Sequence, residues 1–368
     1  DYFTMGGDGA HEVAVGPVHA GVIEPGHFRF QCLGEDVFSL EISLGYQHRG
    51  IEKRMIGGPD KQSIHLIETA CGDSSCAYAG AYCQILEQLS PGCRVSDRNQ
   101  ALRVVAWELE RIANHVGDLG ALAGDVAFRP TMAYCGRIRG EFLNMTAALC
   151  GNRFGRGLIV SGGFGCEVNL EICNKLLTWL NKTDEELNNA LELLFEAPTV
   201  LDRFENTGMV SAETARETGL VGVAARASGL SQDVRHCHPY GWYNHLELPI
   251  TSSDSGDVLA RAQVRMRELE FSLSAVASLL ENLPLPGKTS SQHRLSGERI
   301  AVSLVEAWRG ELCHVALTDE SGKFSSYKVV DPSFHNWFGL AMALRGEQIS
   351  NFPLCNKSFN LSYCGHDL

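Results

Sequence analysis

The sequence lacks several features that mark well-defined classes of protein. It has no run of about 18 apolar residues, so no segment is expected to span a membrane by itself. No secretory signal is visible, and the opening at Asp1 in place of a methionine is consistent with a trimmed fragment of a longer protein. There is no GxGxxG turn after a strand and no P-loop. We therefore expect no NAD(H), flavin or ATP bound to this chain.

Positive charge is also scarce. Lys and Arg number 31 against 44 Asp and Glu, which gives a formal net charge of −13. An acidic surface argues against nucleic acid as a partner and against direct docking on anionic lipid. The 368 residues, 44% hydrophobic and 20% charged, suit a globular protein with two or three packed sub-domains.

Cysteine is plentiful, but no two cysteines form a Cys-x-x-Cys pair. The 13 cysteines are an odd number spread along the whole chain, unlike the framework of a small disulfide-rich domain. Zinc and iron–sulfur sites usually depend on such local pairs. We therefore predict reduced, mostly buried thiols and no cofactor bound by this chain.

Hydrophobic periodicity divides the chain into three units and predicts an α+β fold. Short strands and turns are expected in an N-terminal β-rich unit, residues 1–60. A central antiparallel helical bundle with interspersed loops is expected over 61–285. Period-two patterns return in 286–368, which predicts a C-terminal unit with a small β-sheet.

Individual elements follow from the same patterns. Apolar residues recur every three or four positions over 102–119 and 258–283, which indicates two bundle helices. Thr183-x-x-Glu186 resembles a capping box and predicts that a third helix starts at Thr183. Alternating patterns predict three strands, at 300–305, 312–317 and 324–330.

Six strings of residues carry a family resemblance. They are Gly16-Pro17-Val18-His19, Glu24-Pro25-Gly26-His27-Phe28-Arg29-Phe30, Gly45-Tyr46-Gln47-His48-Arg49-Gly50-Ile51-Glu52-Lys53, Glu108-Leu109-Glu110-Arg111-Ile112-Ala113-Asn114-His115, Arg226-Ala227-Ser228-Gly229 with Asp233-Val234-Arg235, and Arg309-Gly310-Glu311. Together they resemble the large subunit of group 4 (energy-converting) NiFe hydrogenases and the 49-kDa subunit of respiratory complex I (NADH-quinone oxidoreductase). The resemblance covers essentially the whole chain. It implies a helical bundle flanked by β-containing units, with a C-terminal tail that returns to the bundle cavity.

A nickel–iron centre needs four cysteine thiolates, which this family supplies from one Cys-x-x-Cys in the bundle and one near the C-terminus. Here Cys71 matches the first ligand, but Ser74 takes the second position. Ser362 and Gly365 take the C-terminal positions, with Cys364 between them. Serine is not a soft ligand at neutral pH. The resemblance therefore implies a variant without the full nickel-ligand set, and we expect no NiFe centre.

Other uses of the vacated cavity stay open. Since the two ligand segments meet in this fold, the resemblance implies a cavity lined by Cys71, Asp73, Ser74, Cys76, Ser362, Tyr363, Cys364 and His366. One alternative is a different metal held by Cys71, Cys76, Cys364 and His366. A cluster of unligated buried polar residues is the favoured interpretation.

Complex I uses the same cavity for a quinone head group, to which a histidine and a tyrosine donate hydrogen bonds. His19 matches that histidine, and Asp125 resembles the aspartate that orients it and raises its pKa. Cys71 occupies the tyrosine position, so Tyr78 or Tyr363 would have to substitute. The resemblance thus implies His19, Asp125 and Tyr78 as catalytic residues and a quinone-like acceptor.

Two further groups of residues allow more than one interpretation. Arg226, Asp233 and Arg235 are expected to form a buried ion network in preference to a substrate site. Asn114 and His115 lie on a predicted bundle helix and face either the cavity or hydrogen-bond partners in the core.

The resemblance also implies partner proteins. His48, Arg49, Glu52 and Arg54 match the contact with a small, B-like iron–sulfur protein of the complex, which would carry the iron–sulfur clusters. A second peripheral partner, the C-like protein, and membrane subunits that translocate ions complete the expected complex. The chain is then expected as a peripheral, non-secreted subunit at the cytoplasmic face of the inner (plasma) membrane.

Three functions follow from these observations. The first is an oxidoreductase subunit without a NiFe centre, which takes electrons from the iron–sulfur partner and couples them to ion translocation. The second is a non-catalytic scaffold that relays conformational change. The third is an H2-active NiFe hydrogenase large subunit. An accessible cavity at His19 favours the first, a cavity packed shut favours the second, and stoichiometric nickel and iron favour the third.

Overall fold

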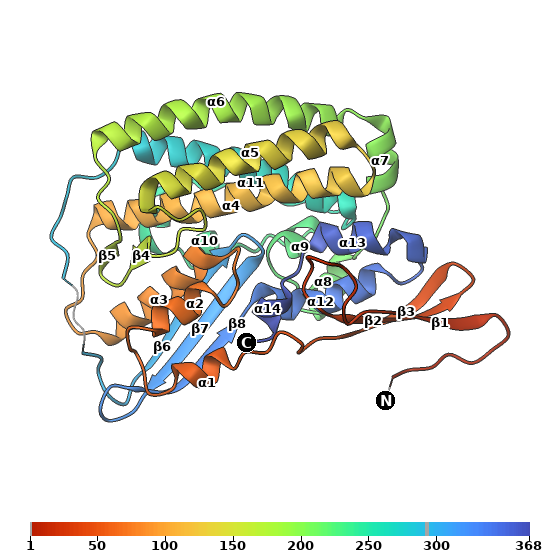
Figure 1. Cartoon of the computed structure of the whole chain (residues 1–368), viewed down its shortest axis with the longest axis horizontal. Coiled ribbons are helices and arrows are strands. Elements are labelled where there is room, and N and C mark those ends of the chain that lie inside the picture. The colour runs from red at the N-terminus through yellow and green to blue at the C-terminus, as the bar shows by residue number, and fades with distance from the viewer. Residues whose placement is uncertain (1, 291–293) are drawn as a thin grey trace.

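A bundle of four long helices forms one side of the molecule in the computed structural model, which describes residues 2–290 and 294–368 (Figure 1). The helices are α4 (Asp97–Asp125), α5 (Arg129–Cys150), α6 (Leu170–Phe195) and α11 (Val258–Glu281). Side-chain caps begin α4 and α11, where Ser96 accepts from the Asn99 amide and Asp257 from the Ala260 amide. Within the described ranges, no helix is both long and apolar enough to cross a membrane.

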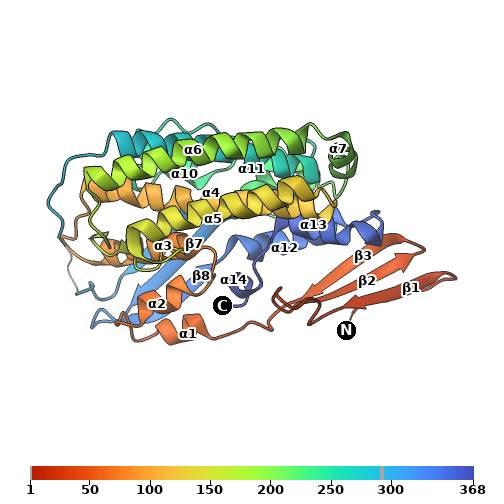
Figure 2. The same ribbon diagram turned by 45° about the horizontal axis from the view of Figure 1, so that its top comes forward.

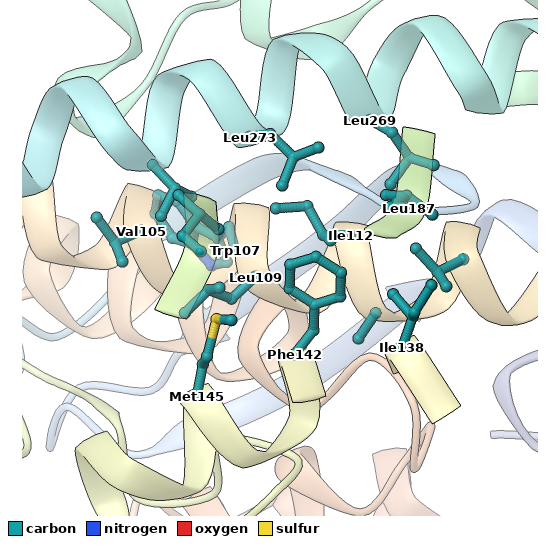
Figure 3. Packing of buried hydrophobic residues seen from close by; sticks show 14 of the residues in the cluster. Val105, Trp107, Leu109, Ile112, Ile138, Phe142, Met145, Leu187, Leu269 and Leu273 are labelled. Atoms are coloured by element: carbon teal, nitrogen blue, oxygen red, sulfur yellow. The ribbon is translucent and has the colours of Figure 1, made fainter. Parts of the chain in front are cut away.

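Apolar side chains from all four helices fill the centre of the bundle. Ile112 of α4, Phe142 of α5, Leu187 of α6 and Leu273 of α11 point toward one another (Figure 3), and each is at most 7% exposed. Burial of one such side chain contributes about 1.5–3 kcal/mol to the stability of the fold. The bundle is therefore a rigid support for the segments that pack against it.

A three-stranded antiparallel sheet packs on the bundle side that carries α3 (Ser75–Leu89). Its strands run in the order β6 (Ile300–Ala307), β7 (Gly310–Thr318) and β8 (Phe324–Val330). Tyr82 of α3 and Leu312 of β7 belong to the same buried cluster. The three predicted strands are confirmed, and the first two extend beyond their predicted ends.

A second antiparallel sheet holds the N-terminal segment against the C-terminal helices. Its strands run in the order β1 (Ala10–Val15), β2 (His27–Leu33) and β3 (Asp36–Ser43). Phe28 and Phe30 point to one face because side chains alternate along a strand, and both are fully buried. Their rings lie 5.0 Å from that of Phe352, at the start of α13 (Phe352–Phe359). This packing fixes the loop between β1 and β2.

Short elements connect these parts. They are α1 (Ile51–Met55), α2 (Ser63–Glu68), β4 (Ile159–Val160), β5 (Gly163–Phe164), α7 (Pro198–Phe204), α8 (Ala212–Glu217), α9 (Gly222–Ala227), α10 (Val234–Cys237), η1 (Gly241–His245), α12 (Pro332–Ala343), η2 (Ile349–Asn351) and α14 (Tyr363–His366). In both views α14 and the C-terminus lie between the two three-stranded sheets (Figures 1 and 2). The end of the chain therefore reaches the middle of the molecule.

The prediction that a helix starts at Thr183 is wrong. Helix α6 begins at Leu170, where the Asn169 side chain accepts from the Ile172 amide. Thr183 lies inside this helix, is buried, and donates its hydroxyl to the Trp179 carbonyl at 2.8 Å. A Thr-x-x-Glu string can occur inside a helix, because a threonine hydroxyl there bonds back to the preceding turn.

The predicted buried ion network is present and ties the bundle to β6. Arg226 on α9 donates to Glu268 at 2.6 Å and to Glu306 at 2.8 Å. Arg235 on α10 binds Asp233 at 2.7 Å and Glu108 at 3.1 Å. These side chains are at most 3% exposed. Buried charges of both signs therefore compensate one another, which is the structural role that the sequence favoured.

Asn114 and His115 point in different directions from α4. The His115 Nε2 atom lies 2.8 Å from Glu268 Oε2, so His115 belongs to the core. The Asn114 amide donates to the Asp73 carbonyl at 2.9 Å. Asn114 thus supports the segment between α2 and α3, which leads into the candidate site.

Candidate functional site

A cavity of about 780 Å³ lies where the two ends of the chain meet. It is lined by the β1–β2 loop, which contributes His19, and by α13 and the tail that follows it. Asp73, Asp125 and Arg309 contribute charged side chains. The cavity combines an apolar loop with a small set of polar groups.

His19 is held by the C-terminal tail. Its Nε2 atom lies 3.2 Å from the Tyr363 hydroxyl, and its ring packs edge-on to Phe28 with 5.5 Å between centroids. Burial lowers the pKa of His19, which keeps the imidazole neutral at pH 7. Burial also raises the pKa of Tyr363 to about 12. The pair is a neutral hydrogen-bonding unit at the cavity wall.

Asp125 is not the orienting partner of His19. It lines the same cavity, and burial raises its pKa. Among the described residues, however, no hydrogen bond joins it to His19, whose partner is Tyr363. The prediction that Asp125 orients His19 and raises its pKa is wrong, because desolvation of the ring lowers that pKa.

Two thiols meet beside Ser362. The Cys71 sulfur lies 3.2 Å from the Ser362 hydroxyl, which is 3.4 Å from the Cys364 sulfur. The interaction of the two neighbouring thiols raises the pKa of Cys71 and lowers that of Cys364. Cys364 lines the cavity, whereas Cys71 is 1% exposed. The thiol that faces the cavity is therefore the one that ionises more readily.

Arg309 and Asp73 form an ion pair beside these thiols. The two terminal guanidinium nitrogens donate to the Asp73 carboxylate, at 2.7 and 2.8 Å. Burial opposes ionisation of Asp73, but Arg309 outweighs it and lowers the pKa of Asp73. Asp73 also accepts from the Cys71 thiol at 3.2 Å. The pair places a cation next to Cys71 and leaves the carboxylate one-third exposed.

Tyr78 and Ser74 lie behind this cluster. Tyr78 is fully buried on α3, and its hydroxyl donates to Asp331 at 2.6 Å. Burial and the Asp331 carboxylate raise the pKa of Tyr78 well above its usual value. Ser74 is buried at the start of the same helix. Tyr363, and not Tyr78, is therefore the tyrosine whose side chain lines the cavity.

The alternative metal ligands are not brought together. The Cys76 sulfur faces the Gly155 carbonyl at 3.9 Å, and the His366 ring stacks on Phe334 with centroids 5.7 Å apart. In the part of the chain that the structure describes, no three His, Cys, Asp or Glu side chains are placed to hold a metal ion. The proposed set is therefore split between different places: Cys71 and Cys364 at the tail, Cys76 near Gly155, and His366 on Phe334.

Comparisons with known proteins identify the family to which this chain belongs. The family described as "Respiratory-chain NADH dehydrogenase, 49 Kd subunit" matches residues 125–299. The carbon monoxide-induced hydrogenase of Rhodospirillum rubrum is 31% identical over 353 residues, which cover 95% of this chain and 97% of that protein. The chain belongs to the family of group 4 hydrogenase large subunits and complex I 49-kDa subunits.

Two further comparisons agree with this assignment, one at the level of sequence and one at the level of the fold. NADH-quinone oxidoreductase subunit 4 of Thermus thermophilus is 29% identical over 362 residues, which cover 91% of this chain and 88% of that protein. A chain of the membrane-bound sulfane sulfur reductase, an archaeal respiratory membrane complex, superposes with a TM-score of 0.90. It is 24% identical, and 98% of each chain is covered, so it establishes the fold. The predicted α+β fold class is confirmed.

The residues predicted to meet an iron–sulfur partner lie on and before α1. His48, Arg49 and Arg54 are exposed. Arg49 also donates to the Ala70 carbonyl at 2.6 Å, and Glu52 accepts from the Val329 amide at 3.0 Å. These two side chains therefore fix α1 to the rest of the fold. Contact of this family segment with a partner stays a prediction.

Sequence reasoning gave Arg309 and Glu24 no role in the site. Arg309 stood in a family string, Arg309-Gly310-Glu311, and that string was the available signal. Glu24 accepts from the Cys364 amide at 3.1 Å, so it fixes the thiol against the β1–β2 loop. This contact joins residues from opposite ends of the chain, and no local pattern predicts it.

Proposed function

We propose that this chain is the large redox-module subunit of a complex I-like or energy-converting-hydrogenase-related membrane complex. It takes electrons from a small, B-like iron–sulfur protein and passes them to a small acceptor in the cavity at His19. The C-like protein and membrane subunits that translocate ions complete the complex, which places the chain peripherally on the cytoplasmic face. The iron–sulfur clusters are bound by the partner proteins and not by this chain.

The observation that carries this proposal is the cavity itself. A volume of about 780 Å³ is enough for a small organic acceptor, and its wall holds polar groups from both ends of the chain. Tyr363 supplies a hydroxyl and Arg309 a positive charge, while Asp125 supplies a carboxyl group whose pKa burial raises. Such groups bind an acceptor and move protons as it is reduced. A scaffold without chemistry would not need an accessible polar cavity.

The residues present do not fit a nickel–iron centre. Four soft ligands are required, and the cluster contains the thiols of Cys71 and Cys364 with the hydroxyl of Ser362 between them. A side chain added at Gly365 would meet the Asp331 carboxylate, since its Cβ would lie 2.6 Å from Oδ2. The fourth ligand position is therefore closed by a neighbouring carboxylate. This geometry supports an acceptor other than protons reduced at nickel.

The proposal is tested on the complex purified from membranes through a tag on this chain. We expect an iron–sulfur protein and integral membrane subunits to copurify, and metal analysis to find iron without stoichiometric nickel. After the clusters are reduced, a soluble quinone analogue should reoxidise their paramagnetic resonance signals. Stoichiometric nickel together with H2 production would overturn the proposal in favour of a hydrogenase.

Two variants distinguish catalysis in the cavity from a scaffold role. Tyr363→Phe and His19→Gln keep the shape of the wall and remove a proton-carrying group, so reoxidation should slow by about 100-fold. Tyr134→Phe, an exposed tyrosine on α5, is the matched control and should leave the rate unchanged. Equal rates in all three variants, with an intact complex, would favour the scaffold.

A further inference from the structure

We infer that Cys364 and Cys71 are a redox-active pair of catalytic thiols, and that the acceptor reduced in the cavity is a compound with a sulfur–sulfur bond. This inference rests on the proposed function, because the pair must be re-reduced by electrons from the iron–sulfur partner. It goes further by naming the acceptor class and the reacting atoms.

The two thiols lie at different distances from the cavity. Cys364 lines the cavity, and Cys71 lies behind it, 1% exposed. The Ser362 hydroxyl lies within 3.4 Å of both sulfurs and so bridges the two thiols. A thiol that meets the substrate and a second thiol within its reach are the two parts that thiol–disulfide exchange requires.

One cation and two carboxylates surround the pair. The Arg309 guanidinium lies 3.6 Å from the Cys71 sulfur and stabilises negative charge on it. Asp73 accepts a hydrogen bond from that thiol at 3.2 Å, which orients the buried sulfur. The Glu24 carboxylate holds the Cys364 amide at 3.1 Å, which fixes the attacking sulfur. The other buried cysteines lie outside this arrangement; Cys76, for example, faces a backbone carbonyl.

The reaction balances in three steps. The Cys364 thiolate attacks the substrate R–S–S–R′, so that a Cys364–S–S–R bond forms and R′S⁻ leaves. The Cys71 thiol attacks the Cys364 sulfur, which forms the Cys71–Cys364 disulfide, and its proton leaves with the departing sulfur as RSH. Two electrons from the partner's iron–sulfur cluster then cleave this disulfide; a proton from solvent restores the Cys71 thiol, and Cys364 returns as the thiolate. The net change is R–S–S–R′ plus two electrons and one proton to RSH and R′S⁻.

The test uses the purified complex and bis(2-hydroxyethyl) disulfide as the probe. After oxidation, remaining thiols are alkylated and peptides are analysed by mass spectrometry. We expect a disulfide between the peptides of Cys71 and Cys364, which disappears when the clusters are reduced. In Cys71→Ser the reaction should stop after the first step and leave a mercaptoethanol adduct on Cys364.

Cys364→Ser should lose both products and slow reduction of the probe by about 100-fold. Cys237→Ser, at an exposed cysteine on α10 that takes no part in these contacts, is the matched control and should keep the disulfide and the rate. Cys71→Ala repeats the trapping experiment should the serine variant be unstable. Because Cys364 lies at the cavity edge, its replacement should not prevent folding.

The outcomes separate this inference from the proposed function. If Cys364→Ser still reduces the probe at the wild-type rate, or if both thiols stay free in the oxidised complex, the thiol pair is refuted, whereas electron delivery to the cavity still stands. If the disulfide forms but the reduced clusters do not cleave it, the inferred catalytic cycle fails because electron delivery fails. If quinone analogues reoxidise the clusters and the probe does not, the acceptor class is refuted.

Discussion

The bundle and the cavity both contain buried charges, but these charges differ in how many partners they have and in how far they are exposed. In the bundle, Arg226 has three acidic partners, Asp233, Glu268 and Glu306, and is fully buried. In the cavity, Arg309 pairs with one carboxylate, Asp73, which is one-third exposed. The first arrangement is closed and serves stability. The second leaves charge in contact with a space that a ligand can enter, and this difference is why the proposed reaction is assigned to the cavity.

The largest effect is expected from opening the closed network. Arg226→Ala leaves Glu268 and Glu306 buried without their main partner, so the free energy of unfolding should fall by about 3–5 kcal/mol. Urea unfolding of the full chain measures this change. Arg137→Gln, which removes an exposed ion pair with Glu186, is the control and should have little effect. Equal losses in both variants would contradict the distinction between closed and exposed charges.

An effect that depends on pH, and is intermediate at about pH 4.5, is expected from a neutral buried histidine. Burial lowers the pKa of His314 from 6.5 to about 3, and its Nδ1 atom meets the Tyr327 hydroxyl at 2.8 Å. Between these values the unfolded chain binds a proton that the folded chain does not. Stability should therefore fall as the pH drops from 6.5 toward 3, by about 1.4 kcal/mol per pH unit from this group. His314→Gln should flatten the slope of unfolding free energy against pH; an unchanged slope would refute this.

The smallest effect on stability, but a large effect on function, is expected at Arg309. Arg309→Gln removes the partner of a carboxylate that the cavity already hydrates in part, so the free energy of unfolding should fall by only about 1–2 kcal/mol. Reduction of the cavity acceptor should fall by about tenfold or more, since the charge beside Cys71 is lost. Unfolding and turnover are measured on the same preparation. A stability loss as large as that of Arg226→Ala would remove the contrast between the two regions.

Much of the fold was predictable because its patterns are local. The helices over 102–119 and 258–283 and the three C-terminal strands follow from apolar periodicity, which reports a face that must be buried. The error at Thr183 arose because a capping pattern does not distinguish the start of a helix from its interior. Family strings indicated the region of the site, and they identified His19 and Cys71 as residues to examine.

The sequence by itself determined the family, the fold class and the absence of the nickel-ligand pattern, because these depend on residue identities and short spacings. The tertiary structure decided which groups meet. It paired His19 with Tyr363 in place of Asp125, placed Tyr78 behind the wall, and set Cys364 in front of Cys71. These contacts join residues from opposite ends of the chain, and packing of the tail against the N-terminal sheet determines them.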